Sequence, residues 1–151
     1  MAAFITKEQI QELRDKTGVS VMACKRALEK AEGDVNRAME FLKEEGVLLA
    51  SKKAERETKM GTIVSYVHGG RIGALVEIKC ETDFVARNPD FQNFARELAM
   101  QVAASSPEDL KGLLEGPYIK NPGQSVGDIV KEAIQKFGEN IEVSRFSRLE
   151  L

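Results

Sequence analysis

The sequence is poor in the residues that most often carry catalytic or metal chemistry. Its 151 residues include no tryptophan, a single histidine (His68) and two cysteines, Cys24 and Cys80, without paired spacing. No His-Glu or Cys-His cluster occurs, so we expect no catalytic residues, no metal site and no bound cofactor. These shortages predict a binding protein rather than an enzyme. Isolated cysteines also favour a reducing, cytoplasmic location.

The sequence also lacks a long apolar run and an excess of charge of one sign. No stretch of about 18 uninterrupted apolar residues is present, so we expect no membrane span. Twenty-two Lys and Arg residues oppose 24 Asp and Glu residues, for a formal net charge of -2. Such a balance does not draw a protein to phosphate backbones, so direct contact with nucleic acid is not expected. A helical adaptor or nucleic-acid-binding protein, with the first helices as a helix-turn-helix, stays as the alternative.

The N-terminal part of the chain has the pattern of three short helices. The segment Thr6-Lys7-Glu8-Gln9 is a capping box at the start of the first helix. A second helix is predicted over residues 20–31, and Asp34 is a good N-cap for a third helix that ends before Gly46. The sequence therefore predicts a compact three-helix domain at residues 1–45.

A charged segment and a change of period follow these helices. Residues 46–60 lack an apolar period, which predicts a linker. Residues 47–60 contain neither proline nor glycine, so we expect the linker to be at least partly helical. From Gly61 the apolar residues recur with a period of two over residues 62–67 and 72–80. Gly69-Gly70 lies between these runs, so they are predicted to form a β-hairpin.

Helices are predicted after the hairpin. A wide apolar stripe follows Pro89 and predicts a helix that covers one face of the hairpin. Ser106 is expected to open a further short helix, and residues 117–124 are expected to form a loop. Ser125-Val126-Gly127-Asp128 is the capping box of a last helix.

A final strand over residues 141–149 is predicted to join the edge of the hairpin. The fold class is therefore α+β: an N-terminal three-helix bundle, then a three-stranded antiparallel sheet with helices packed on one face, over residues 61–151. The other face of the sheet, or one of its edges, is expected to be left bare.

The segment that joins the hairpin to the long helix is the main candidate site. It places Asp83-Phe84 at a turn between two rigid elements, where binding groups are common and an aromatic ring can anchor in a partner. The alternative is that Phe84 packs on the core beneath it. Physical chemistry alone favours this structural interpretation, because aromatic residues are more often core than contact residues.

A second candidate surface lies on the predicted second helix. Lys25-Arg26 and Lys30 form a basic edge beside Val21 and Met22. Composition favours a solvated helix face with Met22 in the bundle core, whereas the adaptable methionine side chain also suits a binding surface.

Three motifs, in order along the chain, resemble those of the elongation factor Ts family. They are RDKTG with MACKRAL at residues 14–18 and 22–28, TDFVARN at residues 82–88, and GENI at residues 138–141. The resemblance implies that the first domain is ubiquitin-associated-like and that the rest is part of the family's core or dimerisation region. Longer members add a second subdomain and a coiled coil, and some short members pair two chains sheet against sheet. The resemblance therefore implies a homodimer.

The resemblance also implies the function and the partner. Members of the family are guanine nucleotide exchange factors for translation elongation: they bind elongation factor Tu, GDP-bound or nucleotide-free, and promote GDP release so that GTP can bind. Phe84 would be a wedge inserted near the magnesium and phosphate site, with Asp83 beside it and Thr82 and Val85 shaping the turn. The N-terminal docking residues would be Arg14, Val21, Met22 and Lys25. Val21 and Ala23 differ from the methionine and aspartate that are common in the family.

Overall fold

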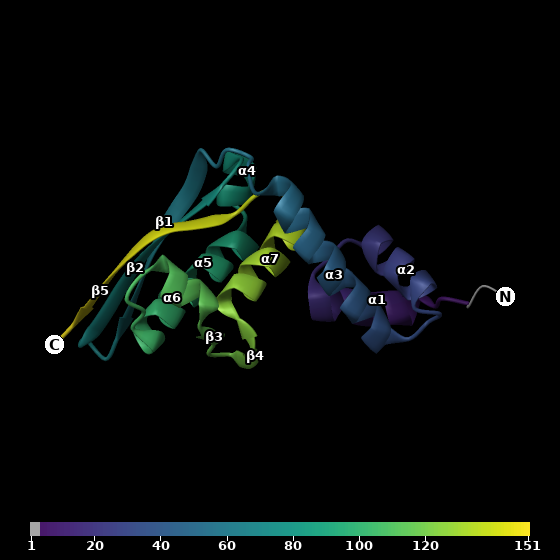
Figure 1. Cartoon of the computed structure of the whole chain (residues 1–151), viewed down its shortest axis with the longest axis horizontal. Coiled ribbons are helices and arrows are strands. Elements are labelled where there is room, and N and C mark those ends of the chain that lie inside the picture. Colours follow the sequence, from purple (N-terminus) through teal and green to yellow (C-terminus); the bar gives the residue numbers. More distant parts are fainter. Residues whose placement is uncertain (1–3) are drawn as a thin grey trace.

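A computed structural model describes residues 4–151 and shows a helical bundle joined to a larger layered region by one long helix (Figure 1). The first three residues of the predicted N-terminal domain lie outside the described residues. The bundle comprises α1 (Lys7–Thr17), α2 (Val21–Lys30) and the first half of α3 (Val35–Lys53). Its buried cluster includes Leu13, Cys24, Leu28 and Leu42. The domain limits at residues 45 and 60 stay a prediction.

The predicted capping residues begin the helices of the bundle. The Gln9 amide donates to Thr6 Oγ1 at 3.2 Å, and the Thr6 amide donates to Gln9 Oε1 at 2.9 Å. This confirms the capping box of α1. Asp34 caps α3 by accepting a hydrogen bond from the Arg37 amide. In each helix the cap side chain therefore satisfies one of the free backbone donors of the first turn, at Gln9 and at Arg37.

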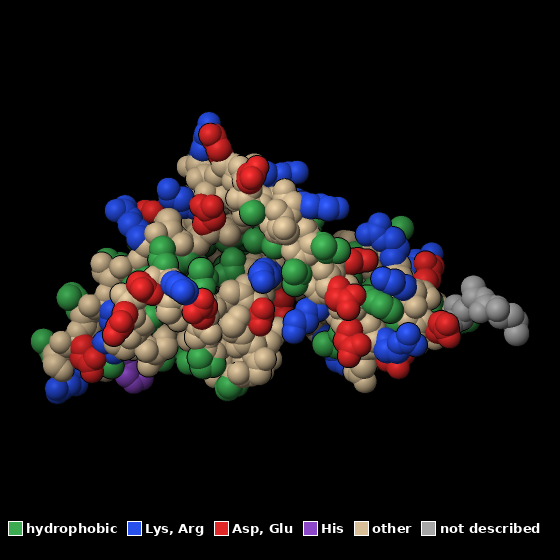
Figure 2. All heavy atoms as spheres, in the orientation of Figure 1, with side chains coloured by type: hydrophobic (Ala, Val, Ile, Leu, Met, Phe, Trp, Pro, Cys, Tyr) green, Lys and Arg blue, Asp and Glu red, His purple; other side chains and the backbone are tan. Residues whose placement is uncertain are grey.

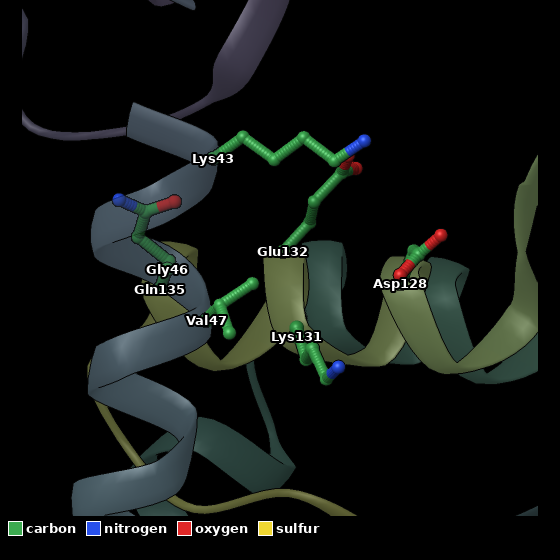
Figure 3. Close-up of a pocket in the computed structure, with 7 residues that line it drawn as sticks. All are labelled: Lys43, Gly46, Val47, Asp128, Lys131, Glu132 and Gln135. Atoms are coloured by element: carbon green, nitrogen blue, oxygen red, sulfur yellow. The ribbon is translucent and has the colours of Figure 1, made fainter. Parts of the chain in front are cut away.

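Helix α3 does not end before Gly46, and this part of the prediction is wrong. The helix continues for 19 residues to Lys53, and Gly46 is buried where α3 crosses α7 (Val126–Phe137) (Figure 3). A Cβ atom on Gly46 would lie 2.8 Å from Gln135 Oε1. Gly46 therefore leaves room for the flexible end of the Gln135 side chain, and the helix tolerates the roughly 1 kcal/mol by which a glycine weakens it. The pocket left between them has a volume of about 20 Å³, enough for about one water molecule.

The larger region is a three-stranded antiparallel sheet with helices on one face, which confirms the predicted fold class. The strand order is β1-β2-β5, and the other face carries no helix of the described chain (Figure 1). The core between sheet and helices includes Val76, Ile78, Phe91, Leu98 and Val102. The elements are β1 (Met60–His68), β2 (Ile72–Cys80), β5 (Glu142–Glu150), α5 (Pro89–Ser105) and α7.

The segment between α5 and α7 differs from the prediction. Ser106 is the C-cap of α5, in the left-handed region with φ 48°, and Asp109 caps the short helix α6 (Leu110–Glu115). The predicted loop contains a small hairpin, β3 (Pro117–Tyr118) with β4 (Asn121–Ser125). The buried Gln101 side chain donates to the Pro117 carbonyl and accepts from the Ile119 amide. The side-chain amide of Gln101 on α5 thus holds the small hairpin, a segment whose sequence has no apolar pattern. The capping box of Ser125 and Asp128 is confirmed.

The uncovered side of the sheet carries an apolar surface, which we call the outer sheet face. Its large apolar side chains are each at least half exposed and come from all three strands: Ile63, Val67, Leu75 and Leu149. Glu77 and Arg145 lie opposite each other on the same face, with Arg145 Nη2 3.1 Å from Glu77 Oε2. Within residues 4–151, no helix is long and apolar enough to cross a membrane.

Candidate functional site

The candidate site is the corner where β2 turns into α5. A four-residue helix, α4 (Asp83–Ala86), fills this corner and begins at Thr82, whose Oγ1 accepts a hydrogen bond from the Val85 amide. Val85 and Ala86 are buried in the core, whereas the Phe84 side chain is 85 % exposed. The interpretation that Phe84 packs on the core is therefore wrong. The ring projects from a helix turn whose opposite side is anchored.

An ion pair borders the exposed ring. Arg87 Nε lies 2.7 Å from Asp83 Oδ2, one helical turn apart. Phe84, both charged residues and the following Asn88 and Pro89 line an open hollow on the surface. The exposed ring thus lies beside polar and charged side chains, an arrangement that suits insertion into a pocket on another protein.

The corner is held from behind by the segment that follows α7. Glu139 Oε1 accepts hydrogen bonds from the backbone amides of Glu81 and Thr82, at 3.1 and 3.0 Å. Glu139 Oε2 accepts a third from Thr82 Oγ1 at 2.7 Å. The Asn140 amide in turn donates to Glu81 Oε1 at 2.7 Å. Two segments far apart in the sequence therefore fix each other.

The N-terminal docking residues lie on the outside of the bundle. Arg14 is exposed on α1, and Val21, Met22 and Lys25 are exposed on α2. The Met22 side chain is 63 % exposed, so its placement in the bundle core is wrong. The core positions of α2 are instead Ala23, Cys24, Ala27 and Leu28. Val21 and Lys25 are four residues apart and share one face of the helix.

The structure does not bring the two sets of candidate residues together. Arg14 and α2 belong to the bundle around the start of α3, whereas α4 lies near the other end of α3 (Figure 1). The helix of 19 residues is about 28 Å long. Its end is fixed to the larger region, because Lys53 Nζ donates to the Gly138 carbonyl and Asn140 Nδ2 donates to the Arg56 carbonyl at 2.9 Å. A partner that meets both surfaces must span this helix.

The described residues offer few groups for metal or nucleophilic chemistry. Within residues 4–151, no group of three or more His, Cys, Asp or Glu side chains could hold a metal ion. Burial raises the pKa of the Cys80 thiol to about 11, and the nearby Glu139 carboxylate adds to this rise. The thiol is therefore protonated at neutral pH and is a poor nucleophile. Figure 2 shows acidic and basic side chains interspersed over the visible face, without a broad area of one sign.

The sequence predicted a role for Phe84 and its neighbours but none for Glu139 or Asn140. Both lie in the third motif, at residues 138–141, yet their partners are more than fifty positions away in the chain. Neither period nor spacing signals such a contact. The local sign was a Gly-Glu-Asn turn directly after a helix, where the helix ends at Gly138 with φ 73°.

Comparison with known proteins identifies the family of this chain. The profile described as Elongation factor TS matches residues 81–151. Proteins named Elongation factor Ts align with nearly the whole chain. The one from Carboxydothermus hydrogenoformans is 40% identical over 193 positions, covering 97% of this chain and 89% of the relative. The one from Thermodesulfovibrio yellowstonii is 38% identical, covering 97% and 96%.

A third relative, from Methylacidiphilum infernorum, is 38% identical over 195 positions, which cover 100% of this chain and 97% of the relative. This alignment is longer than the 151-residue chain, so at more than 40 of its positions the relative has a residue and this chain has a gap. The alignment nevertheless covers both the bundle and the larger region. With matches of this extent, the chain belongs to the elongation factor Ts family.

Proposed function

We propose that this chain is a guanine nucleotide exchange factor that binds elongation factor Tu with GDP bound and promotes GDP release. The observation that carries the proposal is the exposed Phe84 ring on the anchored α4 corner. An apolar ring of this size gains free energy when it enters a pocket of a partner. If that pocket lies beside the nucleotide site, insertion displaces groups that hold the phosphates and magnesium.

The exposed residues of the bundle support a second contact. Arg14 and Lys25 supply positive charge, and Val21 and Met22 supply apolar area on the same domain. We assign this surface to docking on the GTPase domain of elongation factor Tu. Docking and insertion together then favour the nucleotide-free form of the partner. We place this activity in the cytoplasm, where translation takes place.

The proposed activity needs no bond-making step, so we do not assign an enzymatic reaction to the chain. Exchange follows from coupling between two ligands of one partner: if the factor weakens GDP binding, GDP weakens factor binding by the same ratio. Each tenfold change corresponds to about 1.4 kcal/mol. Insertion of one aromatic ring and a docking surface can supply several such steps.

Stopped-flow release of a fluorescent GDP analogue from elongation factor Tu tests the proposal. The chain is expected to raise the release rate by at least ~100-fold at saturation, which corresponds to about 2.8 kcal/mol. The affinity of the chain for elongation factor Tu should fall when GDP is added, by the same ratio by which the chain lowers the equilibrium affinity of elongation factor Tu for GDP. An unchanged release rate, together with binding to nonspecific duplex at low salt, would favour the nucleic-acid-binding alternative.

We further propose that two copies pair through the outer sheet face. A symmetric dimer brings the same surface of each chain together, so the surface must complement itself. The apolar side chains of this face meet that condition, and its charged pair, Glu77 with Arg145, is already matched within one chain. Burial of the exposed apolar area would stabilise the pair.

Leu75→Lys is expected to convert the dimer into a monomer. Leu75 lies on the central strand, so a lysine there would place two positive charges in the middle of the apolar contact. Sedimentation velocity at micromolar concentration should show the mass of two chains for the wild type and of one chain for the variant. Leu48→Lys is the matched control, because Leu48 is also more than half exposed but lies on α3. A wild-type chain that sediments as a monomer would contradict the dimer.

A further inference from the structure

Glu139 makes an unusual number of contacts with the candidate site for a residue outside it. Its carboxylate accepts three hydrogen bonds, all from Glu81 and Thr82, the residues that separate β2 from α4. Thr82 is also the N-cap of the helix that carries Phe84. The Glu139 side chain therefore holds the backbone at residues 81–82, and this backbone sets the direction of α4.

The helix that carries Phe84 depends on such support. α4 has only four residues, and a single turn gains too few internal hydrogen bonds to be stable by itself. Its own backbone bonds run from Ala86 to the Thr82 carbonyl and from Arg87 to the Asp83 carbonyl. A shift of Thr82 would therefore turn the whole helix, and with it the Phe84 ring.

Glu139 can act as a support because its own position is fixed. Its neighbour Asn140 is buried, and the Asn140 side chain donates to the carbonyls of Ala54 and Arg56, directly after α3. Lys53 Nζ donates to the Gly138 carbonyl on the other side of Glu139. The turn after α7 is thus fastened both to the end of α3 and to the α4 corner.

We propose that Glu139 is a positioning residue for nucleotide exchange: its carboxylate holds Thr82 so that Phe84 points outward in the orientation required for insertion. This inference rests on the proposed exchange function. Glu139 need not touch the partner, since it acts through the backbone of residues 81–82. Because a binding group that is loosely supported loses its effect, removal of the carboxylate should reduce exchange more than it reduces stability.

Two measurements on Glu139→Ala test the two halves of the proposal. Hydrogen exchange of the Glu81 and Thr82 amides in the free protein should become at least ~10-fold faster, because both amides lose their acceptor. Stimulated GDP release from elongation factor Tu should fall by roughly tenfold at saturating factor, the scale of a small error in position. Glu139→Gln keeps an oxygen at Oε1 and should restore slow amide exchange and most of the release rate.

Two controls distinguish positioning from a general loss of stability. Glu97→Ala removes a carboxylate that likewise joins two elements, through Tyr118 and Lys120, and should lower stability without slowing GDP release. In a Phe84→Ala background, Glu139→Ala should cause no further loss, because residues that act through one another are not additive. Full additivity of the two substitutions would overturn the proposal.

The outcomes separate this inference from the function on which it rests. If the wild-type chain does not accelerate GDP release, the exchange function fails, while faster amide exchange in Glu139→Ala would still establish the support of the corner. If the wild type accelerates release and Glu139→Ala does so equally well, the positioning role is wrong. Unchanged protection of both amides in Glu139→Ala would also overturn it.

Discussion

Replacement of Phe84 by alanine is expected to remove most of the stimulation of GDP release and to leave the fold intact. The ring is 85 % exposed, so its loss should change the free energy of unfolding by less than about 0.5 kcal/mol. Truncation of an anchoring aromatic in an interface typically costs 2 kcal/mol or more, or about 30-fold. Stopped-flow release of a fluorescent GDP analogue measures the first effect, and chemical denaturation measures the second.

The matched control for this experiment is Phe4→Ala. Phe4 precedes α1, is 90 % exposed and lies outside the three motifs, so its truncation removes a similar exposed area at another place on the surface. Its substitution should leave the release rate unchanged. Exchange at the wild-type rate with Phe84→Ala would show that the ring is not the inserted group. The proposed function would then depend on the bundle surface alone.

Phe91→Ala is expected to have the largest effect on stability, about 3–5 kcal/mol. Phe91 is fully buried at the start of α5, and its ring meets Phe137 edge to face with centroids 5.7 Å apart. Its removal opens a cavity between α5, α7 and the sheet, which the surrounding elements can fill only in part. Urea denaturation followed by circular dichroism measures the loss.

Phe94→Ala is the comparison for this loss, because Phe94 lies one turn later on the same helix and is only partly buried. Its substitution should cost clearly less than that of Phe91. Equal losses would mean that burial does not determine the contribution of these rings. Total stabilities of single domains are about 5–15 kcal/mol, so Phe91→Ala can bring the protein close to unfolding at room temperature.

The sequence predicted the elements whose signals are local. The Thr6 and Ser125 capping boxes, the period of two in β1 and β2, and the apolar stripe of α5 each depend on residues within a few positions. Such patterns reflect helix-end hydrogen bonds and one-sided burial, which hold in any fold. They were sufficient for the fold class and for the order of the main elements.

Two of the failures involve contacts between distant residues, and a third concerns which residues of one helical turn are buried. Gly46 was expected to follow the end of a helix, but α3 continues through it where the helix packs against the distant α7. The buried Gln101 orders the small hairpin that was expected to be a loop. Phe84 is exposed although most aromatic residues are buried, because the adjacent Val85 and Ala86 take the core positions of α4. The first two outcomes depend on partners that no local pattern reveals.

The continuity of α3 has a consequence for how this chain can tolerate change. Each residue of an α-helix turns the chain by about 100° and advances it by 1.5 Å. A single insertion or deletion near Gly46 would therefore swing Arg14 and Met22 a quarter turn around the helix axis relative to Phe84. Substitutions of exposed side chains on α3 would not change this angle between the bundle and Phe84. The number of residues in α3 is thus under tighter constraint than their identity.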